Sequence, residues 1–159
     1  MKNRNLFAIL LLAVVTLCSC GKESGRDAFI GVYNGSESVE AYEIDTETGE
    51  SESYSEVDNS FNNVTIGIGT SDDEILIYIG DSYICDEYPS GDYLRATVDG
   101  KTFTATDVYN DGAGWTGTIT AEGSIKDGRL IVNFENIGED ESYAYEYNYK
   151  VTWDLTKVQ

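Results

Sequence analysis

Apolar and polar positions alternate with a period of two along most of this chain. Over residues 115–126, Trp, Gly, Ile, Ala, Gly and Ile occupy one set of alternate positions, and Thr, Thr, Thr, Glu, Ser and Lys occupy the other. Because successive side chains of a β-strand point to opposite faces, this segregation predicts a half-buried antiparallel strand. After residue 27, no run of ten residues has apolar side chains at the i, i+3, i+4 and i+7 spacing of an amphipathic helix, so this part of the chain is predicted to be all-β.

The same alternation predicts further strands, separated by short polar turns. They cover residues 29–35, 39–45, 64–69, 75–80 and 142–157, with a weaker strand over residues 53–57. Residues 47–56 and 82–92 are predicted to be polar loops. Eight to ten strands in sequence order favour an antiparallel up-and-down meander that closes and so removes its exposed edges. We therefore expect one domain over residues 28–159, a lipocalin-like β-barrel of about eight strands with little or no helix, whose interior holds side chains or one small ligand.

Two Asp-Gly pairs follow predicted strands. Asp-Gly favours the two-residue type I′ turn, in which both central residues take positive φ. Such a turn sets the register of its hairpin, and apolar residues meet in five of the six cross-strand pairs that Asp99-Gly100 and Asp127-Gly128 predict. These pairs are Val98 with Lys101, Ala96 with Phe103, Leu94 with Ala105, Ile125 with Leu130, Gly123 with Val132 and Ala121 with Phe134.

The start of the chain has the pattern of a secretory signal peptide. Lys2 and Arg4 precede an uncharged stretch over residues 6–17. As a helix this stretch would be about 18 Å long, which is too short to span a bilayer. A basic start, a short apolar segment and a small residue at the end are typical of a signal that is removed, here over residues 1–19.

The end of this segment resembles a bacterial lipobox. The sequence Leu-Cys-Ser-Cys places the small Ser19 directly before Cys20, the position at which the thiol is acylated by chains such as palmitate. We expect Cys20 to anchor the protein in a membrane and residues 20–27 to form a flexible tether. A metal pair formed with Cys18 is disfavoured, because the chain has no His and only one other Cys, whereas soft-metal sites need three or four ligands.

Charge limits the partners of the mature chain. Without Lys2 and Arg4, eight of the ten basic residues remain against 29 acidic ones, a formal charge of −21. Such a field repels nucleic acid and anionic headgroups, and it attracts cationic partners or divalent ions. Cys85 is then the one thiol left, so no intramolecular disulfide is expected, and we predict a buried or half-buried apolar Cys85.

Three segments carry a family resemblance. FIGVYNG at residues 29–35, ATVDGKTFT at residues 96–104 and GSIKDGRLIVNF at residues 123–134 resemble the small lipocalin-like lipoproteins of Bacteroidales-type bacteria. The resemblance implies a calycin-like β-barrel and a location in the cell envelope, attached to the outer membrane on its periplasmic face or at the cell surface. Acidic residues after the acylated cysteine accompany surface display in those bacteria, and Lys22-Glu23 matches that signal in part. The resemblance implies no catalytic residues.

Catalytic chemistry finds little support. The absence of His excludes nucleophilic catalysis that uses it, no glycine-rich phosphate loop precedes a helix, and no cofactor is expected. The many acidic residues leave a carboxylate-based hydrolase as an alternative without a particular pair of acids. The acidic run at residues 72–74 lies between two predicted strands, where turn formation explains it. We expect a protein that is not an enzyme.

Calcium is the cation that clustered carboxylates and loop carbonyls suit best. Asp107, Asp111 and Gly112 match positions 1, 5 and 6 of an EF-hand loop, but Thr118 stands where the bidentate Glu belongs. A second frame that starts at Asp45 has its glycine one place early. We therefore assign no metal site.

The most suggestive feature is a run of alternate tyrosines on the last predicted strand. Tyr143, Tyr145, Tyr147 and Tyr149, here called the tyrosine stripe, share one face with Trp153. They could line a cavity and stack on an apolar or aromatic ligand, with their hydroxyls fixing its orientation. Alternatively they fill the barrel and bond one another, or they face outward as a surface for a partner.

These observations support three hypotheses. The first is a lipid-anchored envelope protein, expected to be a monomer, whose non-catalytic barrel binds a ligand or acts as an accessory module. The second is an acidic surface lipoprotein that captures a cationic protein or peptide, as bacterial lysozyme inhibitors do. The third, the hydrolase, needs two acids that converge in a cleft with the pKa of one of them raised.

Overall fold

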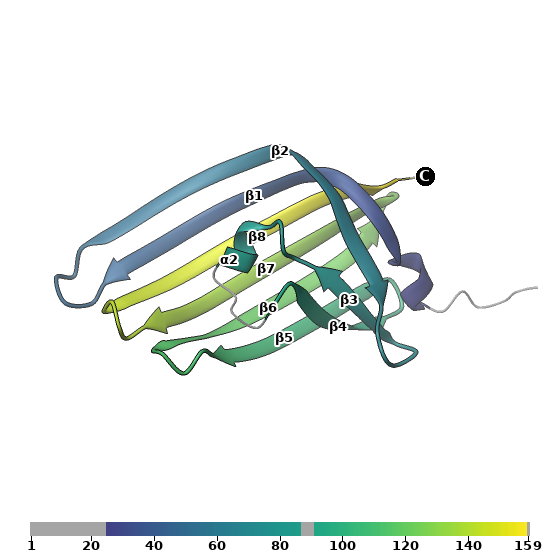
Figure 1. The fold of residues 1–159 in the computed structure, drawn as a ribbon. Coiled ribbons are helices and arrows are strands. Elements are labelled where there is room, and N and C mark those ends of the chain that lie inside the picture. Colours follow the sequence, from purple (N-terminus) through teal and green to yellow (C-terminus); the bar gives the residue numbers. More distant parts are fainter. Residues whose placement is uncertain (1–24, 87–90, 159) are drawn as a thin grey trace, which may run out of the picture.

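The computed structural model describes residues 25–86 and 91–158, without the side chains of Cys85 and Asp86. The expectations for the signal at residues 1–19, for lipidation of Cys20 and for burial of Cys85 therefore lie outside its description. The elements (Figure 1) are η1 (Gly25–Ala28), β1 (Gly31–Asp45), β2 (Ser51–Ile68), β3 (Glu74–Tyr78), α2 (Tyr83–Asp86), β4 (Tyr93–Asp99), β5 (Thr102–Asn110), β6 (Trp115–Lys126), β7 (Arg129–Asp140) and β8 (Tyr145–Lys157).

The eight strands form a closed antiparallel barrel. Each strand pairs with its neighbours in sequence, and β8 returns to pair with β1 along thirteen residue pairs. The predicted all-β, up-and-down barrel is thus confirmed. Residues 25–27, which were expected to belong to the tether, form the short η1 together with Ala28, and η1 contacts β4. Within the described ranges, no helix has the length and apolar character that crossing a bilayer requires.

The barrel is closed by strands of very different length. β2 has 18 residues and β1 has 15, whereas β3 has five and β4 has seven. β2 pairs with β3 only over Ile66, Gly67 and Ile68, and three residue pairs join β4 to β5. We call the end of the molecule that contains β3, β4 and η1 the closed end. The other strands run past it as a six-stranded sheet, the extended sheet, on the left of Figure 1.

Four of the predicted strands merge into two. Residues 31–35 and 39–45 belong to one strand, β1, and residues 53–57 and 64–68 belong to β2, so the predictions of a strand start at residue 29 and a strand end at residue 69 were wrong by two residues and one residue. The predicted loop over residues 47–56 was wrong in its second half, because β2 begins at Ser51. β1 keeps its pairing with β8 throughout, although its register against β2 shifts on either side of Gly35. The serines and acids of β2 lie on an exposed hairpin, where no buried face imposes apolar alternation.

The turn at Asp127-Gly128 has the predicted geometry. Asp127 and Gly128 take positive φ values of 52° and 79°, as a type I′ turn requires. The three predicted pairs of this hairpin, which include Gly123 with Val132, are present in the structure. The turn residues and the apolar pattern thus specify the same register independently.

The register predicted at the other Asp-Gly pair was wrong by two residues. Asp99 pairs with Thr102, so the loop is Gly100-Lys101 rather than Asp99-Gly100. Of the two loop residues, only Gly100 takes positive φ, 61°, and glycine at the first central position is typical of the type II′ turn. A shift of two residues leaves every side chain on its predicted face, which is why the apolar pattern did not reveal it.

The closed end is packed with apolar side chains. Phe29 and Phe103 meet edge to face with ring centroids 5.2 Å apart, and both are at most 1% exposed. The Phe103 ring lies over Gly123 on the neighbouring strand, where an added Cβ would overlap the ring. Trp153 is fully buried further along the barrel, and the centroids of its ring and the Phe134 ring are 4.5 Å apart. The interior of this end is therefore a packed core.

Replacing Gly123 tests this packing. We expect Gly123→Ala to destabilise the fold by about 1–3 kcal/mol, because the new methyl group must displace a buried ring. Gly67→Ala is the matched control in another strand, since its Cβ would come no closer than 3.9 Å to its nearest neighbour, the Leu76 carbonyl oxygen. Urea unfolding followed by tryptophan fluorescence measures both changes, and equal midpoints for the two variants would contradict the packing described.

Candidate functional site

The tyrosine stripe is shorter than predicted and lies inside the barrel. β8 begins at Tyr145, so the predicted start of this strand at residue 142 was wrong. Tyr143 belongs to the turn before β8 and is 80% exposed, because Ala144 takes a positive φ of 53° and reverses the chain there. Tyr147 and Tyr149 are 2% and 4% exposed. The stripe therefore faces inward, and the alternative of an outward-facing aromatic surface is wrong.

A pair of glycines makes room for two of the tyrosines. Gly117 on β6 and Gly138 on β7 are direct cross-strand partners. Tyr109 pairs with Gly117 from one side and Tyr147 pairs with Gly138 from the other. An added Cβ on either glycine would overlap a tyrosine hydroxyl. The two rings thus lean over the glycine pair from opposite sides, and their hydroxyls meet above it.

The two hydroxyls belong to one directed chain of hydrogen bonds. Tyr109 donates to Asn136 Oδ1 at 2.7 Å, so the proton shared between the tyrosines comes from Tyr147. Tyr147 in turn accepts the indole N–H of Trp115 at 3.0 Å. Asn136 is fully buried, and its amide oxygen would be costly to leave without a donor. The chain therefore satisfies a buried polar group with the hydroxyls of the stripe.

A second chain of hydrogen bonds runs along β8 and ends on β1. Tyr145 and Tyr149 have their hydroxyls 3.4 Å apart, and Tyr149 donates to Glu43 Oε1. The rings of Tyr145, Tyr147 and Tyr149 follow one another with centroids 6.1 and 5.5 Å apart. Tyr145, Tyr147 and Tyr149 therefore form a continuous row of aromatic rings along β8, and the last of them is bonded to the Glu43 carboxylate.

A buried carboxylate that the sequence analysis missed lies deeper in the barrel. Glu37 is 2% exposed and accepts hydrogen bonds from the Trp153 indole at 2.8 Å, from the Ser82 hydroxyl and from the Tyr83 N–H at 3.4 Å. Glu37 and Trp153 are cross-strand partners. In sequence, Glu37 shares its parity with Tyr33, Val39 and Ala41, which places it on the inward face. Dividing β1 into two predicted strands hid that parity.

These contacts hold the segment between β3 and β4 against the barrel. Figure 1 shows α2 lying over the concave side of the extended sheet. Ile84 of α2 is fully buried, and its N–H donates to Ser82 Oγ at 3.2 Å. Tyr83 donates to Glu56 Oε2 at 2.6 Å, and this hydrogen bond, together with partial desolvation, raises the pKa of Tyr83 to about 12. Glu37 and Glu56 thus bind α2 from two strands.

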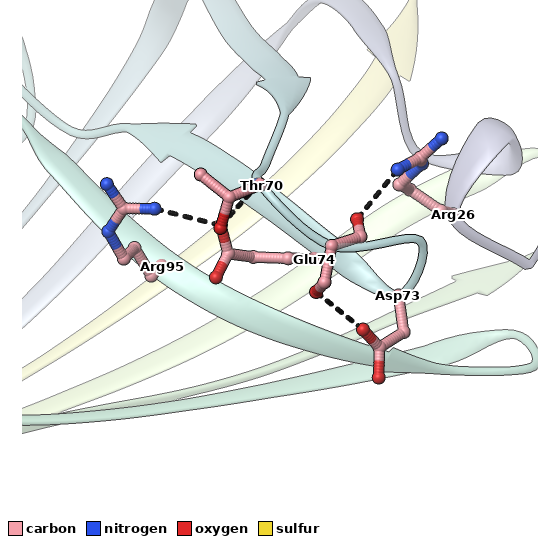
Figure 2. Close-up of polar contacts among 6 residues, drawn as sticks. Arg26, Thr70, Asp73, Glu74 and Arg95 are labelled. Carbon is pink, nitrogen blue, oxygen red and sulfur yellow. Dashed lines mark hydrogen bonds and ion pairs between the residues drawn. The ribbon is translucent and has the colours of Figure 1, made fainter.

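Asp73 and Glu74 of the acidic run at residues 72–74 accept hydrogen bonds at the turn between β2 and β3 (Figure 2). Glu74 Oε1 accepts the backbone N–H of Thr70 at 2.7 Å and the Arg95 guanidinium at 2.8 Å. These contacts hold the pKa of Glu74 below its ordinary value, with the bond from Thr70 N–H as the first cause. Asp73 accepts the Ser71 hydroxyl at 2.6 Å, and Arg26 of η1 donates to the Ser71 carbonyl at 2.7 Å.

The first aspartate of one EF-hand-like frame, Asp45, and the fifth-position aspartate of the other, Asp111, also accept backbone hydrogen bonds in turns. Asp45 Oδ1 accepts the N–H groups of Glu47 and Thr48, and Asp111 Oδ1 accepts those of Ala113 and Trp115. These backbone hydrogen bonds lower the pKa of both aspartates. Over the part of the chain that the structure describes, no three acidic or cysteine side chains gather as a metal ion would require.

Two shallow hollows lie on the outer face of the extended sheet. One has a volume of about 670 Å³ and runs across β2, β1, β8, β7 and β6, with Val57, Lys150 and Glu122 in its lining. The second, of about 470 Å³, lies further along β1, β8, β7 and β6 and contains Tyr42 and Ile137, which are 48% and 49% exposed. The outer face therefore combines apolar side chains with acidic ones.

Comparison with known proteins identifies no relative of this chain. No protein-family model, no curated protein and no solved structure matches it. The resemblance to lipocalin-like envelope lipoproteins therefore stays a prediction.

Removing the Glu37 carboxylate tests its role. We expect Glu37→Ala to destabilise the fold by about 3 kcal/mol, because the buried Trp153 indole and Ser82 hydroxyl lose their acceptor, and Glu37→Gln, which keeps an acceptor oxygen, to cost less. Glu40→Ala, on the exposed face of the same strand, should change stability by at most about 0.5 kcal/mol. Urea unfolding compares the three variants, and a Glu37→Ala midpoint equal to that of Glu40→Ala would refute the role.

Proposed function

We propose that this chain is a lipid-anchored envelope protein whose barrel is a non-catalytic accessory module that binds a cationic partner on its outer surface. The observation that carries the proposal is the pairing of the polar groups inside the barrel with one another. The Tyr147 hydroxyl is bonded to the Tyr109 hydroxyl, which donates to Asn136, and Glu37 accepts from three donors. A ligand at these groups would have to break existing hydrogen bonds.

Surface charge supports a cationic partner. Four of the basic side chains in the described part of the chain lie beside carboxylates. The pairs are Arg26 at 3.7 Å from Asp27, Arg95 at 2.8 Å from Glu74, Arg129 at 2.7 Å from Asp154 and Lys150 at 3.8 Å from Glu135. With 29 acidic residues in the sequence, many carboxylates remain beyond those in such pairs. Their summed field accelerates encounter with a positively charged protein and disfavours an anionic one.

The position of η1 supports an anchored orientation. Gly25 begins η1 at the closed end, on the right of Figure 1. Four residues, 21–24, lie between Cys20 and Gly25, and a chain of this length reaches at most roughly 18 Å even when fully extended. A lipid on Cys20 would hold the closed end near the bilayer, so that the extended sheet, with its hollows and acidic side chains, points away from the membrane.

The anchor is tested by replacing the acylated residue. We expect the wild-type chain, expressed in a bacterium that processes lipoproteins, to incorporate a palmitate analogue and to sediment with membranes. Cys20→Ala should lose the label and move to the soluble fraction, because the thiol that carries the lipid is absent. Cys85→Ala is the matched control and should remain labelled. A Cys20→Ala chain that stays labelled and membrane-bound would disprove the assignment.

The partner class is tested with a cationic protein as probe. We expect the full chain to bind lysozyme at low ionic strength and to bind an acidic protein of similar size at least about tenfold more weakly. Raising the salt from about 0.05 to 0.5 M should weaken the lysozyme complex at least tenfold, since screening shortens the range of the field. Titration by biolayer interferometry gives both values. Equal binding of the two proteins, or a complex that salt leaves unchanged, argues against the proposal.

A further inference from the structure

The extended sheet has an outer strand with one side open. β2 pairs with β1 over residues 51–66, but it meets β3 only at residues 66–68. Among the described residues, therefore, no strand pairs with residues 51–65 on the side away from β1. Figure 1 shows β2 as the outermost strand along this part of the sheet. We call residues 51–57 the β2 edge.

The β2 edge has the geometry that strand addition needs. Eight consecutive residue pairs, from Glu37 with Asp58 to Ile44 with Ser51, join β1 and β2 without a register shift. The seven edge residues have exposed side chains, so both faces beside the strand are accessible. At about 3.3 Å per residue the edge is roughly 23 Å long. Half of the backbone N–H and C=O groups of such a strand point away from its neighbour, toward a strand that could be added.

Proteins usually protect an edge of this kind with lysine, proline, a bulge or a covering element. The β2 edge has no lysine, no proline and no bulge. Its charges are Glu52 and Glu56, which share the inner face of the sheet with Tyr54 between them, as shown by their partners Glu43, Ala41 and Val39 on β1. The opposite face has the uncharged side chains Ser51, Ser53, Ser55 and Val57.

Two carboxylates lie directly opposite each other at this edge. Glu43 and Glu52 are cross-strand partners, and like charges in such a pair are destabilising. Over the described part of the chain, no lysine or arginine forms an ion pair with either of them. A basic side chain on an added strand beside Glu52 would relieve this repulsion. A second copy of β2 would increase it, because its own acids would come to the same face.

We propose that the β2 edge binds, by strand addition, an extended segment of a partner protein that has basic side chains at alternate positions, an inference that rests on the proposed capture of a cationic partner. The alternation follows from the strand period of two. Side chains of the added strand beside Glu52 and Glu56 are basic, and those beside Ser53, Ser55 and Val57 are small or apolar. Backbone hydrogen bonds supply affinity, and the glutamates select the sequence, Glu52 above all, because Glu56 already accepts the Tyr83 hydroxyl of α2.

The test uses short peptides and the full chain in detergent micelles. The probe is an eight-residue peptide of alternating lysine and threonine with blocked termini, and the control has the same composition with its lysines in one block. We expect the alternating peptide to bind at least about fivefold more tightly by fluorescence anisotropy. Hydrogen exchange should show new protection of amides within residues 51–57. No binding of the alternating peptide up to about 1 mM, or protection confined to other strands, would overturn the proposal.

Backbone methylation separates strand addition from charge attraction. Two versions of the alternating peptide have methyl groups on the amides of odd or of even positions, with charge unchanged. One version should lose at least about tenfold in affinity and the other should stay within about twofold, because only one edge of the added strand faces β2. Equal affinities for the two versions would mean that the peptide is held by charge alone.

Charge reversal locates the site on the protein. Glu52→Lys should lower the affinity for the alternating peptide at least about tenfold. Glu146 is an exposed acid on the outer face of β8, and Glu146→Lys should change this affinity by less than about twofold. Equal effects of the two variants would contradict the assignment to β2. If lysozyme still binds the wild-type chain with the expected salt dependence while the peptide results fail, the strand-addition site is wrong and the proposed function stands. If lysozyme does not bind either, both are wrong.

Discussion

The difference in length between neighbouring strands is the constraint on which the rest of this structure depends. β3 and β4 are too short to close the barrel along the full length of β1, β2 and β5–β8. Apolar packing around Phe29 and Phe103 fills the closed end. Beyond it, no strand of the described residues lies opposite the concave face of the extended sheet (Figure 1), so this face is covered by α2 and by its own large side chains. The tyrosines of β8 and the buried Glu37 are consequences of the need for this cover.

Polar groups inside the barrel are arranged to be mutually satisfied. The glycine pair Gly117 and Gly138 has no side chains, which lets Tyr109 and Tyr147 approach from opposite strands until their hydroxyls meet. A buried hydrogen bond in low dielectric is strong, and an unpaired group there is costly. Asn136 and Glu37 are both at most 2% exposed, and accordingly Asn136 accepts from Tyr109 and Glu37 accepts from Trp153, Ser82 and Tyr83. The same satisfaction makes these groups poor candidates for chemistry, because proton transfer or ligand binding would disrupt the packing.

Much of this fold could be predicted from period-two alternation, and the errors have identifiable causes. β6 and the Asp127-Gly128 hairpin were predictable because turn residues and apolar faces agree there. The Gly100-Lys101 turn was missed because a shift of two residues preserves every face. The inward position of Glu37 was obscured because a polar residue interrupts the apolar pattern of β1. Tyr143 was misplaced because nothing in the alternation signals that the chain reverses at Ala144.

The acidic residues fall into two groups with different physical roles. Asp45, Asp73, Glu74 and Asp111 accept hydrogen bonds at turns, and those bonds lower their pKa values, so their negative charge stabilises the fold at neutral pH. Glu43 and Glu52 lie opposite each other on the extended sheet and repel each other. Glu43 accepts the Tyr149 hydroxyl, but in the described part of the chain no basic residue forms an ion pair with either glutamate. Local folding therefore explains the first group and leaves the repulsion within the second without a counter-charge. An acidic pair that disfavours self-association and favours a basic strand would account for its position beside the long edge of β2 that β3 leaves open.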